Sequence, residues 1–298
     1  MKPKILVILG PTATGKSDLA VQLAKKYNSE IISADSRQVY VGLNIGTGKI
    51  TKKEMCGVPH HMLDIISPKK VFSVSEWKKQ TEKIIADIHL RGRLPIICGG
   101  TGFYIQSIVD GLVLPEVAPN HTLRKKLQKK SVSELFDILK KLDPERAKTI
   151  ERKNPVRLIR AIEIAKTLGK IPTLRRTQGK NSYEFLQIGL KLPEKDLKIK
   201  IHRRLISRMK KRMVKEAGNL HKKGLSWKRM RELGLEYRYM ADYLEKKMIK
   251  AQLIQKLETE IWRYAKRQMT WFKRNKKIKW FEPTQTKAIE KEIHRFLD

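Results

Sequence analysis

Residues Lys4–Leu9 read KILVIL, and the eight residues that follow directly read GPTATGKS. The first stretch is a continuous apolar run with the length of a buried strand. The second matches the pattern G-x-x-x-x-G-K-[ST], in which backbone N–H groups at the start of a helix surround phosphate oxygens. Leu19 and Leu23 then recur at helical spacing. The order of strand, glycine loop and helix therefore predicts a phosphate-binding loop at the first turn of an α/β fold.

The glycines, Lys16 and Ser17 of this loop suit the binding of an anion. The glycines let N–H groups point inward, Lys16 neutralises the outer phosphate, and the Ser17 hydroxyl is an oxygen ligand suited to Mg²⁺. A nucleoside triphosphate is the usual occupant of such a loop, but a diphosphate ester presents the same oxygens. The phosphate-binding residues that we expect are Gly10, Pro11, Thr12, Ala13, Thr14, Gly15, Lys16 and Ser17.

Strand and helix signals alternate in the first part of the chain, which predicts a parallel sheet covered by helices on both faces. From Pro115 the pattern changes to short helices, and Glu184–Leu192 then resembles a strand that returns to the sheet. We therefore expect an α/β fold, a P-loop NTPase-like parallel sheet flanked by helices, with an inserted all-helical domain. The core would comprise residues 1–117 and 183–298, and the insertion residues 118–182.

The other expected elements follow from apolar runs and helical periodicity. The strands are Ile31–Ser33, Met62–Ile65 and Leu94–Cys98; the helices are Lys16–Tyr27, Ser75–Leu90, Ser133–Leu142, Pro144–Glu151, Pro155–Thr167, Asp196–Ala217 and Ala251–Arg274; and a polar loop spans Arg175–Tyr183.

The 298 residues include 66 Lys and Arg against 30 Asp and Glu, a formal net charge of +36. The excess is uneven, because residues 1–110 hold 16 basic and 9 acidic residues, whereas the remainder holds 50 and 21. A folded chain tolerates such self-repulsion most readily when its partner is a polyanion. The basic remainder therefore predicts a surface that binds nucleic-acid phosphates, with a lysine-biased composition as the alternative.

Composition also disfavours several classes of protein. The apolar runs are far shorter than the roughly 20 residues of a membrane span, and the first residues lack the layout of a signal peptide. Cys56 and Cys98 are the only cysteines, and neither has a partner at metal-ligand spacing, so a disulfide framework and a zinc site are not expected. We expect a cytoplasmic monomer that does not bind membranes.

Two polar positions follow later strands of the expected sheet. Asp35 comes directly after Ile31–Ser33 and one alanine, and Thr101 follows Leu94–Cys98 and two glycines. The carboxyl ends of parallel strands share one edge of a sheet, where α/β folds bind ligands. Asp35 is therefore a candidate Mg²⁺ ligand, general base or turn cap. The Thr101 hydroxyl is a candidate donor to a leaving-group oxygen, or else part of a strand-ending turn.

Together these segments resemble the tRNA dimethylallyltransferase family, also called tRNA isopentenyltransferase, over nearly the whole chain. The Asp-Ser-x-x-x-Tyr block at Asp35 is more specific to this family than the phosphate loop is. The segments that carry the resemblance are Gly10–Ser17, Asp35–Tyr40, Asn44–Lys49, Pro59–Ile65, Gly99–Tyr104, Asn154–Glu163 and Tyr264–Trp271.

The resemblance implies that the loop, with Mg²⁺, holds the diphosphate of dimethylallyl diphosphate. The dimethylallyl group would pass to the exocyclic amine of the adenosine 3′-adjacent to the anticodon of tRNA. By the same resemblance Asp35 is the general base, Thr101 contacts the bridging oxygen and Arg208 binds the diphosphate. Contacts with the anticodon stem-loop are implied for Asp35, Ser36, Arg37, Gln38, Thr101, Arg124, Val156, Arg157, Leu158, Ile159 and Arg160.

Without the resemblance, Arg208 would be better interpreted as part of the solvated face of a basic helix. The chain departs from the family pattern at Glu236, where Gly usually precedes the Tyr, and at Gly48-Lys49-Ile50, where Ala-Lys-Pro is common.

Three alternative activities share the phosphate loop: a small-molecule or nucleotide kinase, an isopentenyltransferase acting on free AMP, and an RNA-binding NTPase. The basic remainder disfavours the first two activities. The third requires a second apolar strand that ends in Asp, which we do not find in the sequence.

Overall fold

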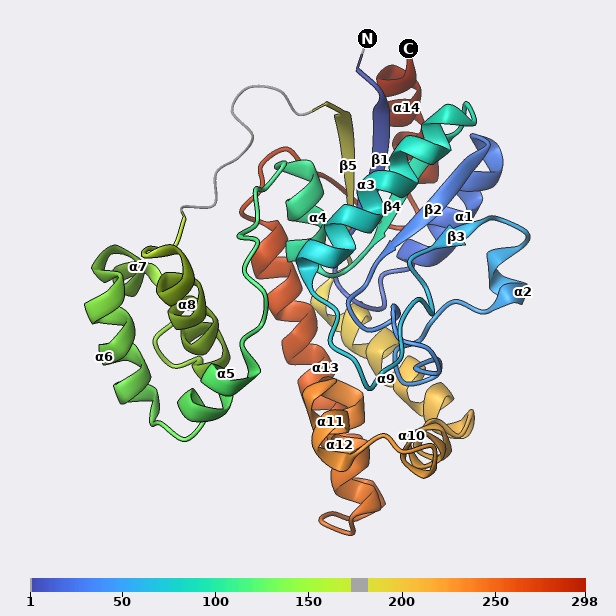
Figure 1. Cartoon of the computed structure of the whole chain (residues 1–298). Helices are drawn as coiled ribbons and strands as arrows, with labels where there is room; N and C mark the ends of the chain where they lie inside the picture. Colours follow the sequence, from blue (N-terminus) through green and yellow to red (C-terminus); the bar gives the residue numbers. More distant parts are fainter. Residues whose placement is uncertain (1, 173–181) are drawn as a thin grey trace. The chain divides into compact units, whose positions relative to one another are not determined.

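The structure is a computed structural model that describes residues 2–172 and 182–298. The chain forms two compact units, one comprising Met1–Val109 with Asn181–Asp298 and the other Asp110–Lys180. In the part that the structure describes, the first unit contains the sheet and the second contains only helices (Figure 1). The expected loop at Arg175–Tyr183 lies almost wholly outside the described residues.

All strand pairs of the sheet are parallel, and the strand order is β3-β2-β4-β1-β5-β6. The strand after the helical insertion, β5, returns to the sheet, as the sequence predicts, and pairs with β1. The predicted α/β architecture is therefore confirmed. The strands are β1 (Lys4–Leu9), β2 (Ser29–Ala34), β3 (His60–His61), β4 (Leu94–Gly99), β5 (Glu184–Leu190) and β6 (Lys279–Phe281).

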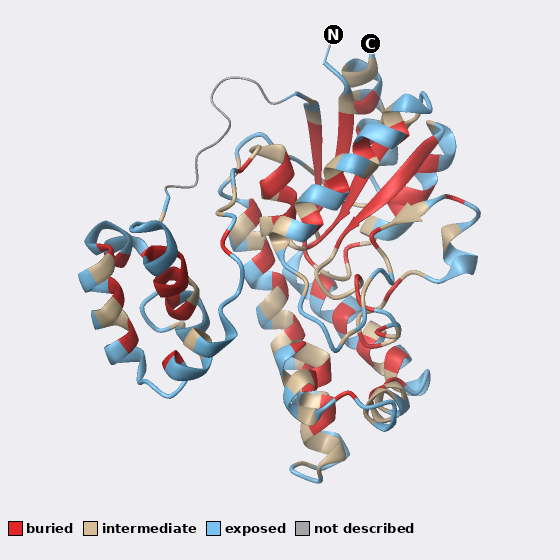
Figure 2. Cartoon of the chain, in the orientation of Figure 1, coloured by how far each residue is buried: buried red, intermediate tan, exposed pale blue. Residues whose placement is uncertain are grey.

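Alternate side chains of β1 are buried in two separate cores, because successive strand residues point to opposite faces of the sheet. Ile5, Val7 and Leu9 pack with helices on one face, and Leu6 and Ile8 with helices on the other. Figure 2 shows the strands as the most continuously buried part of this unit. The first core includes residues of α3 (Val74–Leu90), α4 (Gly102–Val109), α9 (Glu194–Lys210), α10 (Met213–Lys222), α11 (Trp227–Glu232), α12 (Leu235–Leu244) and α13 (Lys250–Phe272); the second includes residues of α1 (Lys16–Lys26) and α14 (Thr286–Leu297).

The expected single helix at Asp196–Ala217 is wrong, because the structure divides it into α9 and α10. Arg212 lies between them with φ 66°, in the left-handed region that ends a regular helix. The bend brings Met213 and Ala217 into the core with no exposed surface. Neither the apolar spacing nor the residue type at Arg212 signals the break, because arginine is a good helix former.

The expected strand at Met62–Ile65 is also wrong. The short strand β3 precedes it, and Met62 and Asp64 both have positive φ, at 64° and 53°. The Nζ atom of buried Lys49 donates to Asp64 Oδ1 at 2.6 Å, which fixes the bend. The side chain of Met62 is buried, so its apolar character reflects core packing without a strand.

The helical unit has its own core and clear start signals for its helices. Ser131 and Glu134 form a capping box, and Asp143 and Asn154 cap the two helices that begin with proline. None of the described helices in either unit is long and apolar enough to cross a membrane. The helices here are α5 (His121–Leu127), α6 (Val132–Leu142), α7 (Pro144–Thr149) and α8 (Pro155–Leu168), and α2 (Lys52–Met55) belongs to the other unit.

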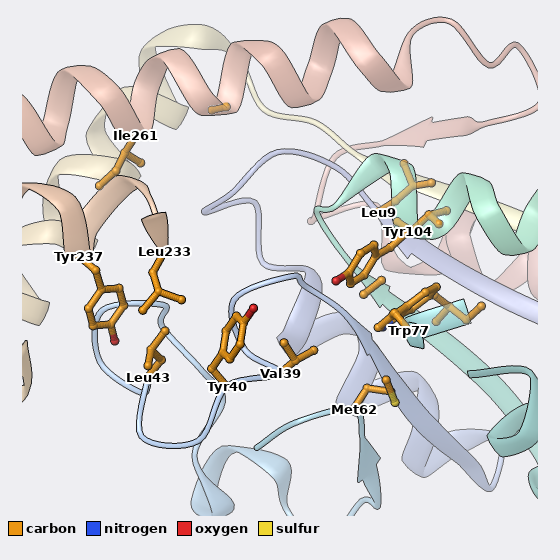
Figure 3. Packing of buried hydrophobic residues seen from close by; sticks show 14 of the residues in the cluster. Leu9, Val39, Tyr40, Leu43, Met62, Trp77, Tyr104, Leu233, Tyr237 and Ile261 are labelled. Carbon is orange, nitrogen blue, oxygen red and sulfur yellow. The ribbon is translucent and has the colours of Figure 1, made fainter. Parts of the chain in front are cut away.

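Trp77 of α3 anchors one face of the sheet at the carboxyl end of β2. Its side chain is fully buried, and its ring stacks on Tyr104 with centroids 4.6 Å apart (Figure 3). The indole Nε1 donates to the carbonyl oxygen of Ser33 at 3.1 Å. One side chain thus joins α3, α4 and β2 immediately before Asp35.

Replacing Trp77 should therefore destabilise this unit strongly. We expect Trp77→Ala to lower the free energy of unfolding by about 3–5 kcal/mol, because it leaves a large cavity. Trp77→Phe should cost less than Trp77→Ala, although it leaves the Ser33 carbonyl without its donor. Denaturant unfolding of the full chain measures both. Trp262→Ala, which removes a partly exposed ring, is the control, and an equal loss in that variant would contradict this role.

Candidate active site

Three neighbouring strands end at the same level of the sheet. Gly99 of β4 pairs with Leu9 of β1 on one side and with Ala34 of β2 on the other. The loops that leave these ends therefore start side by side: the phosphate loop at Gly10, the turn at Asp35 and the Gly-Gly-Thr turn. The carboxyl edge of a parallel sheet is where α/β folds bind ligands, and the phosphate loop, Asp35 and Thr101 all follow strands that end there.

The phosphate loop has the backbone geometry that its glycines permit. Gly10 and Gly15 have φ angles of 139° and 88°, and Gly15 immediately precedes α1. A Cβ atom on Gly10 would lie 2.4 Å from the carbonyl oxygen of Leu190, so β5 approaches too closely for a side chain. The Thr14 hydroxyl donates to the Pro11 carbonyl at 2.9 Å and closes the loop.

Lys16 is a partly buried cation at the centre of this edge. Its Nζ donates to the Pro11 carbonyl oxygen at 2.5 Å. Burial lowers the pKa of Lys16 to about 8; nearby Arg204 also lowers it, while the Asp35 carboxylate opposes the change. A desolvated ammonium group of this kind gains strongly from an incoming anion. Ser17, the next residue, is exposed at the first turn of α1.

Asp35 caps the turn that follows β2. Its Oδ1 accepts hydrogen bonds from the backbone N–H groups of Arg37 at 2.8 Å and Gln38 at 3.3 Å. The turn-cap interpretation of the sequence is therefore confirmed. A carboxylate has about four lone-pair sites on two oxygens, so capping through Oδ1 leaves acceptor capacity for further chemistry. The Asp35 carboxylate also raises the pKa of Lys16, which shows that its charge acts on the phosphate loop.

Thr101 links the turn after β4 to the Asp35 turn. Its backbone N–H donates to the Ala34 carbonyl at 3.0 Å, and its Oγ1 accepts from the Ser36 N–H at 3.0 Å. A Cβ on Gly99 would lie 2.2 Å from the same Ala34 carbonyl oxygen, so the two turns are in close contact. Because Oγ1 acts as an acceptor toward Ser36, the hydroxyl proton of Thr101 is directed elsewhere and can be donated.

Gln268 of α13 is part of this site. In the sequence it is one residue of Tyr264–Trp271, a segment that carries the family resemblance, and it was not predicted as a site residue. Its Oε1 accepts from the Thr12 N–H at 2.9 Å, and its Nε2 donates to the Gly100 carbonyl at 2.8 Å. The buried amide therefore joins the phosphate loop to the Gly-Gly-Thr turn. Its position on a basic amphipathic helix carries no signal for this role, because 256 residues separate it from Thr12.

Two arginines of α9 complete the cationic side of the edge. Arg204 donates from Nη1 to the Thr12 hydroxyl and from Nη2 to the Gly48 carbonyl, both at 3.3 Å. Arg208, one turn further, donates to the Gly46 carbonyl at 3.3 Å and is 8% exposed. The alternative of a solvated helix face for Arg208 is therefore wrong. Burial lowers the pKa of Arg204 to about 10, and the charge of Arg208 adds to this effect.

The loop that receives these guanidinium groups is itself fixed by a carboxylate. Glu216 of α10 accepts three backbone N–H groups, those of Asn44 at 3.1 Å, Ile45 at 2.7 Å and Gly46 at 3.0 Å. The Tyr237 hydroxyl donates to the same carboxylate at 2.7 Å. The Tyr237 ring lies beside Leu43 (Figure 3), and a Cβ on Gly46 would be 2.7 Å from it. Segments that are distant in sequence thus hold the arginine-binding carbonyls in place.

The helical unit contains the other predicted RNA contacts, and a buried carboxylate organises them. Glu163 accepts from Arg124 Nη2 at 2.7 Å and from the Asn120 N–H at 2.6 Å, and it also pairs with Arg160. Arg160 also donates to the Val117 carbonyl at 2.9 Å. Both arginines are therefore held by Glu163, and their side chains remain partly exposed.

The remaining residues of the Val156–Arg160 segment divide between surface and core. Val156 is 75% exposed, and the exposed side chain of Arg157 pairs with Glu151 at 2.7 Å. Leu158 and Ile159 are buried in the core of the helical unit, so their side chains are not on its surface. Among the described residues, no group of three or more His, Cys, Asp or Glu side chains forms a metal site.

Comparisons with known proteins give matches over most or all of the chain. Residues 38–275 match the family described as IPP transferase. A tRNA dimethylallyltransferase of Caldanaerobacter subterraneus is 42% identical, covering 97% of this chain and 95% of that protein. Another, from Anoxybacillus flavithermus, is 37% identical over 100% of this chain and 96% of that protein. The crystal structure of a tRNA isopentenylpyrophosphate transferase from Bacillus halodurans has 36% identity and a TM-score of 0.75, covering 99% of this chain and 97% of that one.

Replacing Glu163 should destabilise the helical unit in a pH-dependent manner. Burial alone would raise the pKa of Glu163, but hydrogen bonds from Arg124, the Asn120 N–H and Arg160 outweigh it and hold the pKa below its ordinary value. We expect Glu163→Gln to lower the free energy of unfolding by about 2–3 kcal/mol, because two arginines lose their anion. The difference from the unaltered chain should be full above the ordinary glutamate pKa and disappear as the pH falls through the lowered value.

Thermal unfolding and amide exchange of residues 110–172 at several pH values measure this loss. Glu151→Gln removes an exposed carboxylate from the same unit and should cost less than about 0.5 kcal/mol. A loss for Glu163→Gln that did not change with pH would contradict an electrostatic role.

Proposed function

Because the chain belongs to the IPP transferase family, we propose that it transfers a dimethylallyl group from dimethylallyl diphosphate to tRNA. The acceptor is the exocyclic amine of the adenosine 3′-adjacent to the anticodon, and diphosphate is released. The family membership confirms the resemblance inferred from the motifs and makes the protein a prenyl-transferring enzyme. The observation that carries the proposal is the meeting of the phosphate loop, Asp35 and Thr101 at three adjacent strand ends.

The cationic groups of the edge suit a diphosphate. The N–H groups of the phosphate loop and the start of α1 favour phosphate oxygens. Lys16 and Arg204 are both desolvated, so the charge of a bound diphosphate would compensate the cost of burying them. Arg208 lies next to Arg204 and adds a third cation. In the proposed complex, these three side chains and the loop residues 10–17 hold the diphosphate.

Mg²⁺ fits the oxygen donors at this edge. It prefers oxygen ligands, takes few of them from protein and takes the rest from water and phosphate. Ser17, the last residue of the loop, is exposed, and the charge of Asp35 acts on the neighbouring Lys16. When bound, the ion would neutralise part of the diphosphate charge. Ser17 is the residue that we propose as its ligand.

Asp35 is proposed as the general base. The amine of adenine is a poor nucleophile, because its lone pair is delocalised into the ring, and its nitrogen must lose a proton as the new C–N bond forms. A positioned carboxylate contributes roughly 10²–10⁴-fold to such a step. The backbone N–H groups of Arg37 and Gln38 hold Oδ1 and so restrict the orientation of the carboxyl group.

Thr101 and the cations are proposed to stabilise the leaving group. As the allylic C–O bond breaks, negative charge grows on the bridging oxygen, and donors fixed on that oxygen stabilise the transition state more than the ground state. The Ser36 N–H orients the Thr101 hydroxyl so that its proton remains available. Arg208, held at the Gly46 carbonyl, supplies charge to the same diphosphate.

The tRNA is proposed to contact both units. A stacked adenine must be splayed or flipped out of the anticodon loop, which costs a few kcal/mol, and phosphate contacts from the basic chain can offset this cost. The contacts proposed are Asp35, Ser36, Arg37, Gln38 and Thr101 in the sheet unit, and Arg124, Val156, Arg157, Leu158, Ile159 and Arg160 in the helical unit. For the two buried residues, Leu158 and Ile159, contact would be made by the backbone.

We further propose that the protein acts as a monomer in the cytoplasm. Both cysteines are free, one exposed and one buried, which suits a reducing compartment.

A labelled-donor experiment tests the function. The full chain is incubated with tRNA and either prenyl-labelled dimethylallyl diphosphate or γ-phosphate-labelled ATP. We expect label in tRNA only from the prenyl donor, because the site is built around a departing diphosphate. AMP in place of tRNA tests the free-nucleotide alternative. Phosphate release from ATP without prenyl transfer, or transfer to AMP at an equal rate, would show that the proposal is wrong.

Replacing Asp35 tests its role as the base. We expect Asp35→Asn to lower kcat by about 10²–10⁴-fold and to change tRNA affinity little, because asparagine keeps the Oδ1 acceptor for Arg37 and Gln38. Single-turnover kinetics and tRNA binding are measured in parallel. Asp87→Asn removes an exposed carboxylate of α3 that pairs with Arg91. It should change neither the rate nor the tRNA affinity. Equal losses of rate and binding in Asp35→Asn would argue against a base.

A further inference from the structure

Glu236, which replaces the glycine usual in the family pattern, lies inside the cationic site. It belongs to the first turn of α12, and its Oε1 accepts from Arg208 Nη1 at 3.2 Å. The pair is largely removed from solvent, with 10% of the Arg208 side chain and 17% of the Glu236 side chain exposed. The guanidinium group proposed to bind diphosphate is therefore already paired with a carboxylate.

The surroundings of this pair are crowded with charge. A Cβ on Gly48 would lie 1.9 Å from Arg208 Nη2 and 2.5 Å from Arg204 Nη2, so both guanidinium groups lie against this glycine. Lys16, Arg204 and Arg208 are the cations of the cluster, and Asp35 and Glu236 are its carboxylates. With glycine at position 236, the cluster would have one negative charge fewer.

The backbone of Glu236 cannot withdraw easily from the site. The adjacent Tyr237 is fully packed, and its hydroxyl donates to Glu216, which also holds the backbone of the 44–46 loop. Burial raises the pKa of Glu236 in spite of the neighbouring Arg208, so the carboxylate is poorly solvated. Because Glu236 is already paired with Arg208, a second anion brought next to Arg208 must compete with this side chain.

We propose that Glu236 is a built-in counter-ion of the diphosphate site, which positions Arg208 before the donor binds and competes with diphosphate for it afterwards. This inference rests on the proposed function, because it takes Arg208 as a ligand of the donor. Glu236 is a positioning residue. It orients the Arg208 side chain, and it lowers the affinity for diphosphate by pairing with Arg208 and by repelling the anion.

The competition acts more strongly on the product than on the donor. When the allylic C–O bond breaks, its electron pair stays on the bridging oxygen, the carbon is bonded to the adenine nitrogen, and the amine proton passes to Asp35. The diphosphate thus gains one negative charge. A fixed carboxylate next to Arg208 repels this product more than the ester, which favours its release.

Isothermal titration of the full chain with inorganic diphosphate tests the proposal without relying on turnover. Glu236→Gln keeps an acceptor for Arg208 and removes only the charge, so we expect Kd to fall about tenfold with tRNA affinity unchanged. Because the variant breaks a largely buried ion pair, its Tm without diphosphate should be lower. Product inhibition of prenyl transfer by diphosphate should strengthen in parallel. Glu232→Gln removes a half-exposed carboxylate paired with Arg229 and should leave Kd as it is.

A double-mutant cycle with Arg208→Gln separates competition for Arg208 from general repulsion. The gain in affinity from Glu236→Gln should be clearly smaller in that background, and a gain of the same size there would overturn the proposal. An unchanged or higher Kd in Glu236→Gln would also overturn it, and Glu236→Gly replaces this variant if it does not fold. Failure of the unaltered chain to bind diphosphate would reject the proposed function as well, so the two failures are distinguishable.

Discussion

The register between β1, β4 and β2 is the constraint on which the rest of the site depends. Because Gly99 pairs with both Leu9 and Ala34, three loops leave the sheet at one level, and their first residues need no long side chains to meet. A slip of one residue in either pairing would turn each side chain to the opposite face. The ladder thus fixes the spacing of the functional groups more rigidly than the loops themselves could.

Charge at this edge is balanced against burial. Arg208 is buried and Lys16 and Arg204 are partly buried, which costs solvation free energy, and carboxylates and backbone carbonyls compensate part of this cost. Such a site is stable because the surrounding packing is extensive, with Tyr237, Trp77 and Tyr104 buried nearby (Figure 3). An anionic ligand would compensate the positive charge that these carboxylates and carbonyls leave unbalanced.

The sequence predicted those parts of the structure that depend on local patterns. The phosphate loop, β5 after the insertion and the long α13 were all predicted, because apolar period and glycine spacing encode them directly. The break at Arg212 and the bends at Met62 and Asp64 were missed, since residues there adopt left-handed backbone for tertiary reasons. In the site, Asp35 and Thr101 were predictable from strand ends, whereas Gln268 and Glu163 act through partners distant in sequence.

The amide of Gln268 has a consequence for how the protein is made. It completes the phosphate loop from α13, 256 residues after Thr12. During synthesis, the loop and its neighbouring turn emerge from the ribosome long before this bridge can form. A nascent chain therefore carries an unfinished anion site while it is surrounded by tRNAs, and the site is complete only after α13 has been synthesised.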